Sequence, residues 1–103
     1  MEKILKLEDN DDITAIRSRI DLTFPPLSPE QPLEKDKKRR LLLIIPRKNK
    51  ALHSLVNMKL LARAAQAKGI ELAVVSGQPA VRDYAKEAGV KAFGNARNAQ
   101  WAG

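Results

Sequence analysis

The sequence predicts an α/β fold built on a small parallel sheet, because two apolar runs flank a helical pattern. Leu41-Leu42-Leu43-Ile44-Ile45 is a run of branched apolar residues closed by Pro46. A second run, Leu72-Ala73-Val74-Val75, ends at Ser76-Gly77-Gln78-Pro79. Strands that are apolar along their whole length are covered on both faces, as in parallel sheets flanked by helices. A βαβ unit is the most economical interpretation.

The N-terminal segment predicts a short amphipathic helix over about residues 12–22. Glu8-Asp9-Asn10-Asp11-Asp12 favours a helix start, since carboxylates there accept from unpaired backbone N–H groups and oppose the positive end of the helix dipole. Ile13, Ile16 and Ile20 then recur at helical spacing. The preceding residues, Lys3 to Leu7, fit either a short strand or a frayed end.

Residues 23–34 predict a linker, because four prolines there block both a helix and a central strand. The P-x-x-P spacing occurs twice, from Pro26 to Pro29 and from Pro29 to Pro32. Such spacing is found in ligands of polyproline-binding domains, and it also suits a stiff spacer.

The rest of the chain alternates helices with strands. The longest predicted helix runs from Lys50 to Lys68 and is ended by Gly69. A strand from Glu71 to Ser76 and a helix from Pro79, stopped by Gly89, follow. Residues 90–93 have mixed polarity, which favours a short strand at the sheet edge.

This element order predicts a three-layer Rossmann- or flavodoxin-like domain with a three-stranded parallel sheet and an extra N-terminal helix. Right-handed crossovers leave two strand orders, 2-1-3 and 3-2-1. The first strand is the most apolar and belongs in the centre, so we favour 2-1-3. The predicted organisation is an acidic helix plus linker over 1–34, a βαβαβ domain over 35–98 and a weakly ordered tail over 99–103.

Composition limits the classes of function. The chain has 103 residues, no cysteine and a net charge of +7. Without cysteine there is no disulfide, thiolate metal site or cysteine nucleophile, which agrees with a reducing compartment. No targeting sequence is visible, and the longest apolar run is far shorter than the roughly 20 residues that span a bilayer. We expect a soluble, cytoplasmic domain.

Several stretches together resemble an uncharacterised bacterial family. They are Asp11-Asp12-Ile13-x-x-Ile16-Arg17-x-Arg19-Ile20, Leu41 to Arg47, Leu60-Leu61-Ala62-Arg63-x-Ala65, Gly69-Ile70-Glu71-Leu72-Ala73-x-Val75-Ser76 and Val81-Arg82-x-x-Ala85-x-x-Ala88-Gly89. In longer members of this family a Rossmann-like N-terminal domain precedes a basic segment, a membrane helix and baseplate-J-like modules. The resemblance implies a membrane-proximal position in a longer parent protein, with any membrane contact made by a segment outside this sequence. The family offers no catalytic residues to carry over.

Ligands of open parallel sheets bind beyond the carboxyl ends of the strands, where this chain places three polar or basic loops without carboxylates. Helix N-termini beside two of these loops favour an anion. The sequence therefore predicts a small-anion or nucleotide site. Its candidate residues are Arg47, Lys48, Asn49, Ser76, Gly77, Gln78 and Asn95. The alternative is an ordinary strand-to-helix turn with solvated basic neighbours.

Enzyme templates fail on specific absences. There is no glycine-rich phosphate loop, no dinucleotide fingerprint and no Gly-x-Ser-x-Gly elbow. The single histidine, His53, allows neither a triad nor a multi-histidine metal site, and we expect it on the surface of the first helical turn. Asp11 and Asp12 fit helix capping better than a cation site. We expect a non-catalytic binding or protein-interaction module without a cofactor or metal.

Charge is distributed unevenly, and this suggests a second function. Residues 1–34 carry a net −4, residues 35–50 a net +7 and residues 51–103 a net +4. Weak, sequence-nonspecific nucleic-acid binding through the central block is the alternative function, although no reading element accompanies it. Open sheet edges also favour a protein partner or self-association. The basic block contains Lys37, Lys38, Arg39, Arg40, Arg47, Lys48 and Lys50.

Overall fold

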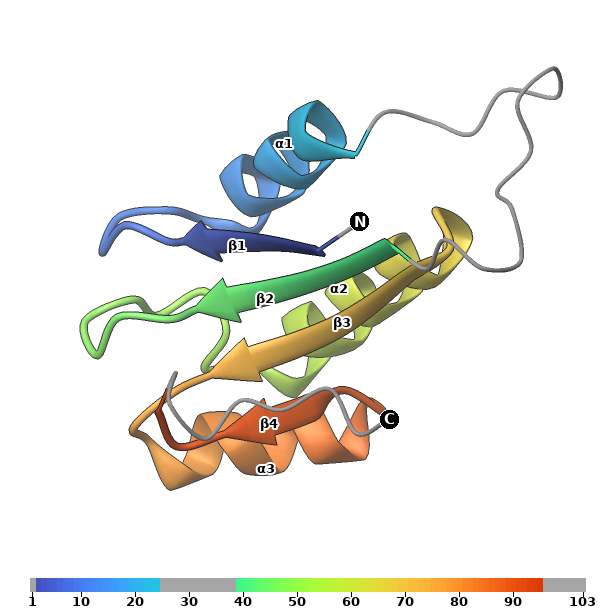
Figure 1. The fold of residues 1–103 in the computed structure, drawn as a ribbon. Helices are drawn as coiled ribbons and strands as arrows, with labels where there is room; N and C mark the ends of the chain where they lie inside the picture. The colour runs from blue at the N-terminus through green and yellow to red at the C-terminus, as the bar shows by residue number, and fades with distance from the viewer. Residues whose placement is uncertain (1, 25–38, 96–103) are drawn as a thin grey trace, which may run out of the picture.

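The computed structural model describes residues 2–24 and 39–95, and within them four parallel strands form one sheet (Figure 1). The strands are β1 (Glu2–Lys6), β2 (Arg39–Ile44), β3 (Ile70–Val75) and β4 (Lys91–Phe93). They lie in the order β1-β2-β3-β4, which is also their order in the chain. The chain is therefore α/β with a parallel sheet, consistent with a Rossmann-like architecture.

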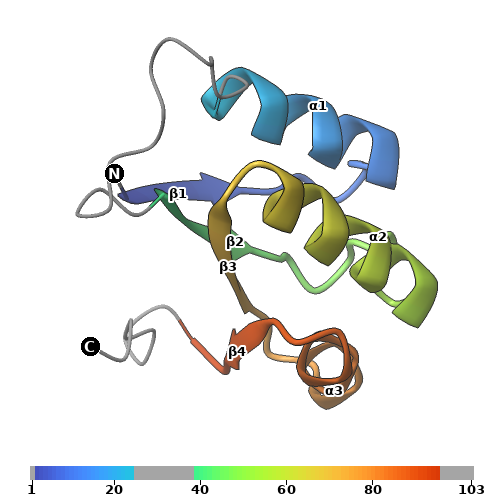
Figure 2. The ribbon, with the colours of Figure 1, turned by 90° about the vertical axis from the view of Figure 1, so that its right-hand side faces the viewer.

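Three helices connect the strands: α1 (Ile13–Thr23), α2 (Leu55–Ala67) and α3 (Pro79–Glu87). Each strand pairs with the next strand in the chain, so every crossover steps in the same direction across the sheet. Right-handed crossovers then place all the helices on one face. Figure 2 shows α1, α2 and α3 on the same side of the sheet. Within the described residues there are two layers, and the predicted three-layer arrangement is wrong.

The predicted strand number and the preferred strand order are also wrong. The fourth strand is β1, in the segment for which the sequence left a strand and a frayed end open. The three predicted strands correspond to β2, β3 and β4 and lie consecutively, which is the 3-2-1 alternative and not 2-1-3. The most apolar strand does have a neighbour on both sides, but its second neighbour is β1 and not β4. The prediction that residues 90–93 form an edge strand is confirmed.

Helix α1 starts as the sequence predicts. The carboxylate of Asp12 accepts a 2.8 Å hydrogen bond from the backbone N–H of Ala15, which is the geometry of an N-cap. Asp11 also has a structural role, since it accepts from the backbone N–H of Glu8 at 2.8 Å and pairs with Arg19 at 2.6 Å. Both carboxylates therefore hold the turn between β1 and α1.

Helix α2 starts five residues later than predicted. Ser54 is its N-cap and accepts a 3.2 Å hydrogen bond from the backbone N–H of Asn57. Residues 50–54 form a turn in which Leu52 is fully buried, so an apolar residue that fits the helical pattern belongs to the loop. The exposed His53 lies in this turn and not in the first turn of the helix.

Glycines end the second and third helices as predicted. Gly69 and Gly89 have φ angles of 68° and 81°, a left-handed conformation that glycine adopts without steric cost. The main core lies between the helices and the sheet, where the largest fully buried side chains pack together. They include Ile16, Ile20, Phe24, Leu41, Leu43, Leu52, Met58, Leu61, Val74 and Val81.

Candidate anion-binding site

The carboxyl ends of β2 and β3 lie at one edge of the sheet, and a cavity lies beside the loops that follow them. Its volume is about 560 Å³. Because the strands are parallel and adjacent, the loop after Ile44 and the loop after Val75 reach the same rim. We call this space the rim cavity. It is lined by Arg47, Lys48, Lys50, His53 and Gln78.

The lining of the rim cavity has an unbalanced positive charge. Arg47, Lys48 and Lys50 are all exposed, and no carboxylate of the described residues lines the cavity. Among residues 2–24 and 39–95, no Asp or Glu forms an ion pair with any of these three cations. Clustered charges of one sign raise the local concentration of the opposite ion. The geometry therefore favours an anionic ligand.

Gln78 joins the two loops that form the cavity. Its side-chain Nε2 donates a 2.7 Å hydrogen bond to the backbone carbonyl of Arg47, although the two residues are 31 positions apart. Its backbone N–H donates to Oγ of the buried Ser76 at 3.1 Å. The Ser76 hydroxyl therefore shapes the turn after β3. Gln78 thus holds the basic loop next to the start of α3.

Asn49 has a different role from its basic neighbours, because its side chain is completely buried. Its Nδ2 donates to the backbone carbonyls of Glu8 at 2.8 Å and Asp11 at 3.0 Å, and its Oδ1 accepts from the backbone N–H of Ala51 at 3.1 Å. Both amide hydrogens are used, so none remains for an anion. Asn49 ties the basic loop to the turn between β1 and α1.

The two helix N-termini at this edge are not equivalent. The first turn of α2 is capped by Ser54, whereas α3 starts at Pro79 and its N-cap residue, Gln78, makes no side-chain capping bond. The uncapped start of α3 adds partial positive charge beside the rim cavity. Only the second of the two predicted helix starts is therefore uncapped.

The remaining predicted site residues lie at the same edge but do not line the rim cavity. Ser76 and Gly77 follow β3, and the exposed Asn95 follows β4. Arg82, which the sequence gave no reason to select, donates from Nη1 to the backbone carbonyl of Ser76 at 2.8 Å. The rim cavity is thus lined by Lys50 and His53 as well as by the predicted Arg47, Lys48 and Gln78, whereas Asn49, Ser76, Gly77 and Asn95 do not line it. The sequence could have indicated His53 as a lining residue, because it is a histidine in a loop that carries several cations.

Strand β2 separates the cations of the basic block, residues 37–50, into those at its amino end and those after its carboxyl end. Arg39 and Arg40 begin the strand, whereas the cavity cations follow its other end, roughly 20 Å away at about 3.3 Å per residue. The Arg39 guanidinium lies 5.9 Å from the centre of the Phe24 ring, and Arg40 pairs with Glu2 and Glu71. Lys37 and Lys38 lie outside the described residues. The described cations of the block therefore form two separate groups.

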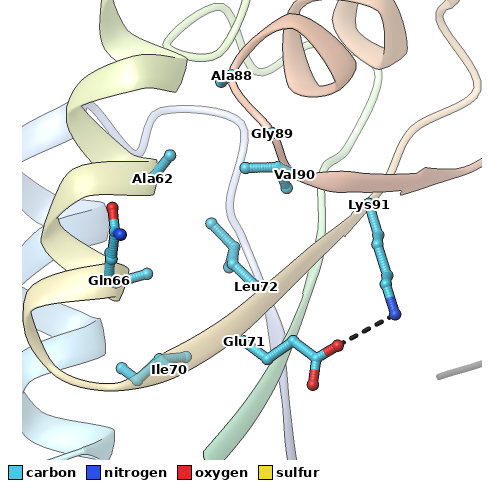
Figure 3. Close-up of a pocket in the computed structure, with 10 residues that line it drawn as sticks. Ala62, Gln66, Ile70, Glu71, Leu72, Ala88, Gly89, Val90 and Lys91 are labelled. Atoms are coloured by element: carbon cyan, nitrogen blue, oxygen red, sulfur yellow. Dashed lines mark hydrogen bonds and ion pairs between the residues drawn. The ribbon is translucent and has the colours of Figure 1, made fainter. Parts of the chain in front are cut away.

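A second cavity, of about 430 Å³, opens at the amino edge of the sheet. β4 begins opposite Ala73, so among the described strands the first residues of β3 have no pairing partner on that side. Figure 3 shows its lining, with the bond between Glu71 and Lys91 dashed. Its lining is mainly apolar and consists of Ala62, Ala65, Gln66, Ile70, Glu71, Leu72, Ala88, Gly89, Val90 and Lys91.

Glu71 at the rim of this second cavity takes part in a charge network. It accepts from Nζ of Lys91 at 3.0 Å and from Nε of Arg40 at 3.3 Å. The hydrogen bond from Lys91 is the largest cause of a lowered pKa for the Glu71 carboxyl, and the charges of Lys91 and Arg40 act in the same direction. This network joins three neighbouring strands at the amino edge.

Other site types are absent from the described part of the chain. Residues 2–24 and 39–95 contain no group of three or more His, Asp or Glu side chains placed to hold a metal ion. Over the same ranges, no helix has both the length and the apolar character to cross a bilayer.

The chain matches no family model, no curated protein and no solved structure.

Proposed function

We propose that this chain is a non-catalytic binding module that holds a small anion, such as the phosphate group of a nucleotide, in the rim cavity. The observation that supports the proposal most strongly is that three cationic residues, and among residues 2–24 and 39–95 no carboxylate, line the cavity. Phosphate oxygens accept hydrogen bonds from guanidinium and ammonium groups, and they are stabilised near an uncapped helix start.

The size of the rim cavity agrees with a small-molecule ligand. Small-molecule sites typically measure about 300–1,000 Å³ and have a few polar groups that fix the orientation of the ligand. The rim cavity has about 560 Å³, and the side chain of Gln78 in its lining is held by its bond to Arg47. A phosphate with an attached sugar or base therefore suits this space better than a bare ion.

The nucleic-acid alternative receives less support from the geometry. A duplex or strand is bound through a row of cations that follows its phosphates. Here Arg39 and Arg40 are engaged by Phe24, Glu2 and Glu71 at the far end of β2. The cations of the rim cavity form a compact group and not a continuous track.

The proposed site is tested by calorimetric titration of ATP and of pyrophosphate into the chain and into a double variant, Arg47→Gln/Lys48→Gln. Loss of two charged hydrogen-bond donors is expected to weaken binding by about tenfold or more, which corresponds to at least about 1.4 kcal/mol. The matched control is Arg17→Gln/Lys59→Gln, which removes the same charge from exposed helix positions that do not line the cavity. Equal weakening in both variants would show that only the net charge matters and would contradict the proposal.

The wider context is a separate proposal. We infer from the family resemblance and the lack of cysteine that the domain works in the cytoplasm, next to a membrane segment of a longer parent protein. Sequencing the complete reading frame tests this, because a downstream apolar stretch of about 20 residues is expected. A complete frame without such a stretch would contradict the membrane-proximal position.

A further inference from the structure

Among the described residues that line the rim cavity, His53 is the one side chain that can change its charge near neutral pH. It lines the cavity together with Arg47, Lys48, Lys50 and Gln78. Imidazole gains a proton between about pH 8 and about pH 5, whereas Arg and Lys stay charged and Gln stays neutral. The chain has one histidine and no cysteine, so no other side chain ordinarily titrates in this range. The number of positive charges in the lining therefore depends on His53.

The turn before α2 holds His53 close to the cations of the cavity. The backbone N–H of His53 donates to the carbonyl of Lys50 at 3.1 Å. Leu52, which lies between them in the chain, is fully buried and anchors the turn in the core. Asn57, in the first turn of α2, donates from Nδ2 to the carbonyl of Ala51 at 2.9 Å. These contacts keep the exposed His53 beside Lys50 at the wall of the cavity.

The elements around His53 bring no acidic side chain of the described residues into the lining. The loop after β2 supplies three cations, and the start of α3 supplies the neutral Gln78. Lys59, the first charged residue along α2, is exposed and lies outside the lining. The carboxylates of the neighbouring elements also lie outside it: Glu8, Asp9, Asp11 and Asp12 between β1 and α1, and Asp83 on α3. An anionic ligand would therefore be the partner of a protonated His53.

We propose that His53 is a binding residue of the rim cavity and that an anion and a proton bind there together. This inference rests on the proposed function, because it needs an anion in the cavity. A negative charge held by the three cations favours the charged form of a neighbouring imidazole, which then donates a charge-assisted hydrogen bond. The complex holds more protons than the free chain, so the affinity for the anion rises as the pH falls.

Titration of sulfate into the isotope-labelled chain, followed by amide chemical shifts at about pH 5.5 and about pH 8, tests this inference. Sulfate keeps the same charge at both pH values, so a change in affinity comes from the protein. We expect the native chain to bind sulfate about three to ten times more tightly at the lower pH, the gain from one added charged hydrogen bond at an open site.

Two variants separate the charge of His53 from its other contributions. His53→Gln cannot gain a proton, and its ratio of affinities at the two pH values is expected to fall below about twofold. His53→Lys carries its charge at both pH values and is expected to bind sulfate tightly at both. The α-amino group of the chain, which also titrates near neutral pH, is present in both variants. Circular dichroism checks that both remain folded.

The ring resonances of His53 give a direct second measurement, because it is the only histidine. They are expected to titrate at higher pH with sulfate than without it, since the coupling between anion and proton is reciprocal. An unchanged ring titration, or the same ratio of affinities in the native chain and His53→Gln, would overturn this inference and leave the anion site standing. Absence of sulfate-induced shifts at both pH values would overturn the proposed function together with this inference.

Discussion

The side-chain amide of Gln78 donates a 2.7 Å hydrogen bond to the backbone carbonyl of Arg47, and this bond joins the loops that follow β2 and β3. These loops supply the described lining of the rim cavity. The position of the cations therefore depends on a neutral side chain from the next crossover.

Replacing Gln78 by alanine is expected to weaken pyrophosphate binding by about fivefold while changing stability by less than about 1 kcal/mol. The variant loses the bond to Arg47, but it also removes Oε1 of Gln78, a buried acceptor without a hydrogen-bond partner among residues 2–24 and 39–95. These two effects on folding oppose each other. Titration calorimetry and urea unfolding measure the two quantities. Unchanged affinity would show that the loop bond does not position the site.

Asn49→Ala is expected to lower the free energy of unfolding by about 3 kcal/mol, since it removes three part-buried hydrogen bonds to backbone groups of Glu8, Asp11 and Ala51. Urea unfolding measures this change. The control, Asn10→Ala, alters an exposed residue and is expected to have an effect within about 0.5 kcal/mol. Similar stabilities for the two variants would contradict the role assigned to Asn49.

Glu71→Gln is expected to make stability less dependent on pH. The pKa of the Glu71 carboxyl is lowered in the folded chain by the hydrogen bond from Lys91, so the ionised form stabilises the fold. This contribution to stability is complete above the unfolded-state pKa of about 4.3. It is lost as the pH falls from there through the lowered pKa of the folded state.

The difference in stability between the native chain and Glu71→Gln should therefore be about 0.5–1 kcal/mol near neutral pH and should shrink steadily in acid. This difference is small because the Glu71 side chain is 33% exposed, which allows solvent to screen its charge. Urea unfolding at several pH values measures it. A difference that stays constant from neutral to strongly acidic pH would contradict the assignment.

Two glycine substitutions are expected to differ in their effects on stability. Gly89→Ala places a side chain at a φ of 81° and is expected to destabilise the chain by about 1–2 kcal/mol. Gly77 does not have a positive φ, and an added Cβ would meet nothing within 4 Å, so Gly77→Ala is expected to be neutral or to stabilise by up to about 1 kcal/mol. Thermal unfolding compares the stabilities of the two variants with that of the native chain. Equal effects would show that the turn conformations are assigned incorrectly.

The sequence predicted the elements best where local chemistry decides the structure. Asp12 marks the start of α1, and Gly69 and Gly89 mark helix ends, because capping and left-handed turns involve only neighbouring residues. The same reasoning failed for α2. Leu52 fits the helical pattern but is buried by the turn before Ser54, and tertiary packing decides that difference.

Strand β1 and the role of Asn49 required three-dimensional information. Among the described strands β1 lies at the edge with one neighbour, β2, so its exposed charged residues hide the alternation that marks a strand. Asn49 lies among basic loop residues, and nothing local distinguishes a buried amide that binds a turn about 40 residues earlier. The rule for parallel sheets predicted which loops meet at the carboxyl edge, whereas the residues that line the rim cavity depend on how those loops fold.

Amide chemical shifts during a pyrophosphate titration of the isotope-labelled chain test the central claim most directly. If the rim cavity binds the anion, the largest shifts occur at Arg47, Lys48, Lys50, His53 and Gln78, with little change at Arg39 and Arg40. Shifts that are absent from the rim cavity, or that are largest at the amino end of β2, would contradict the account.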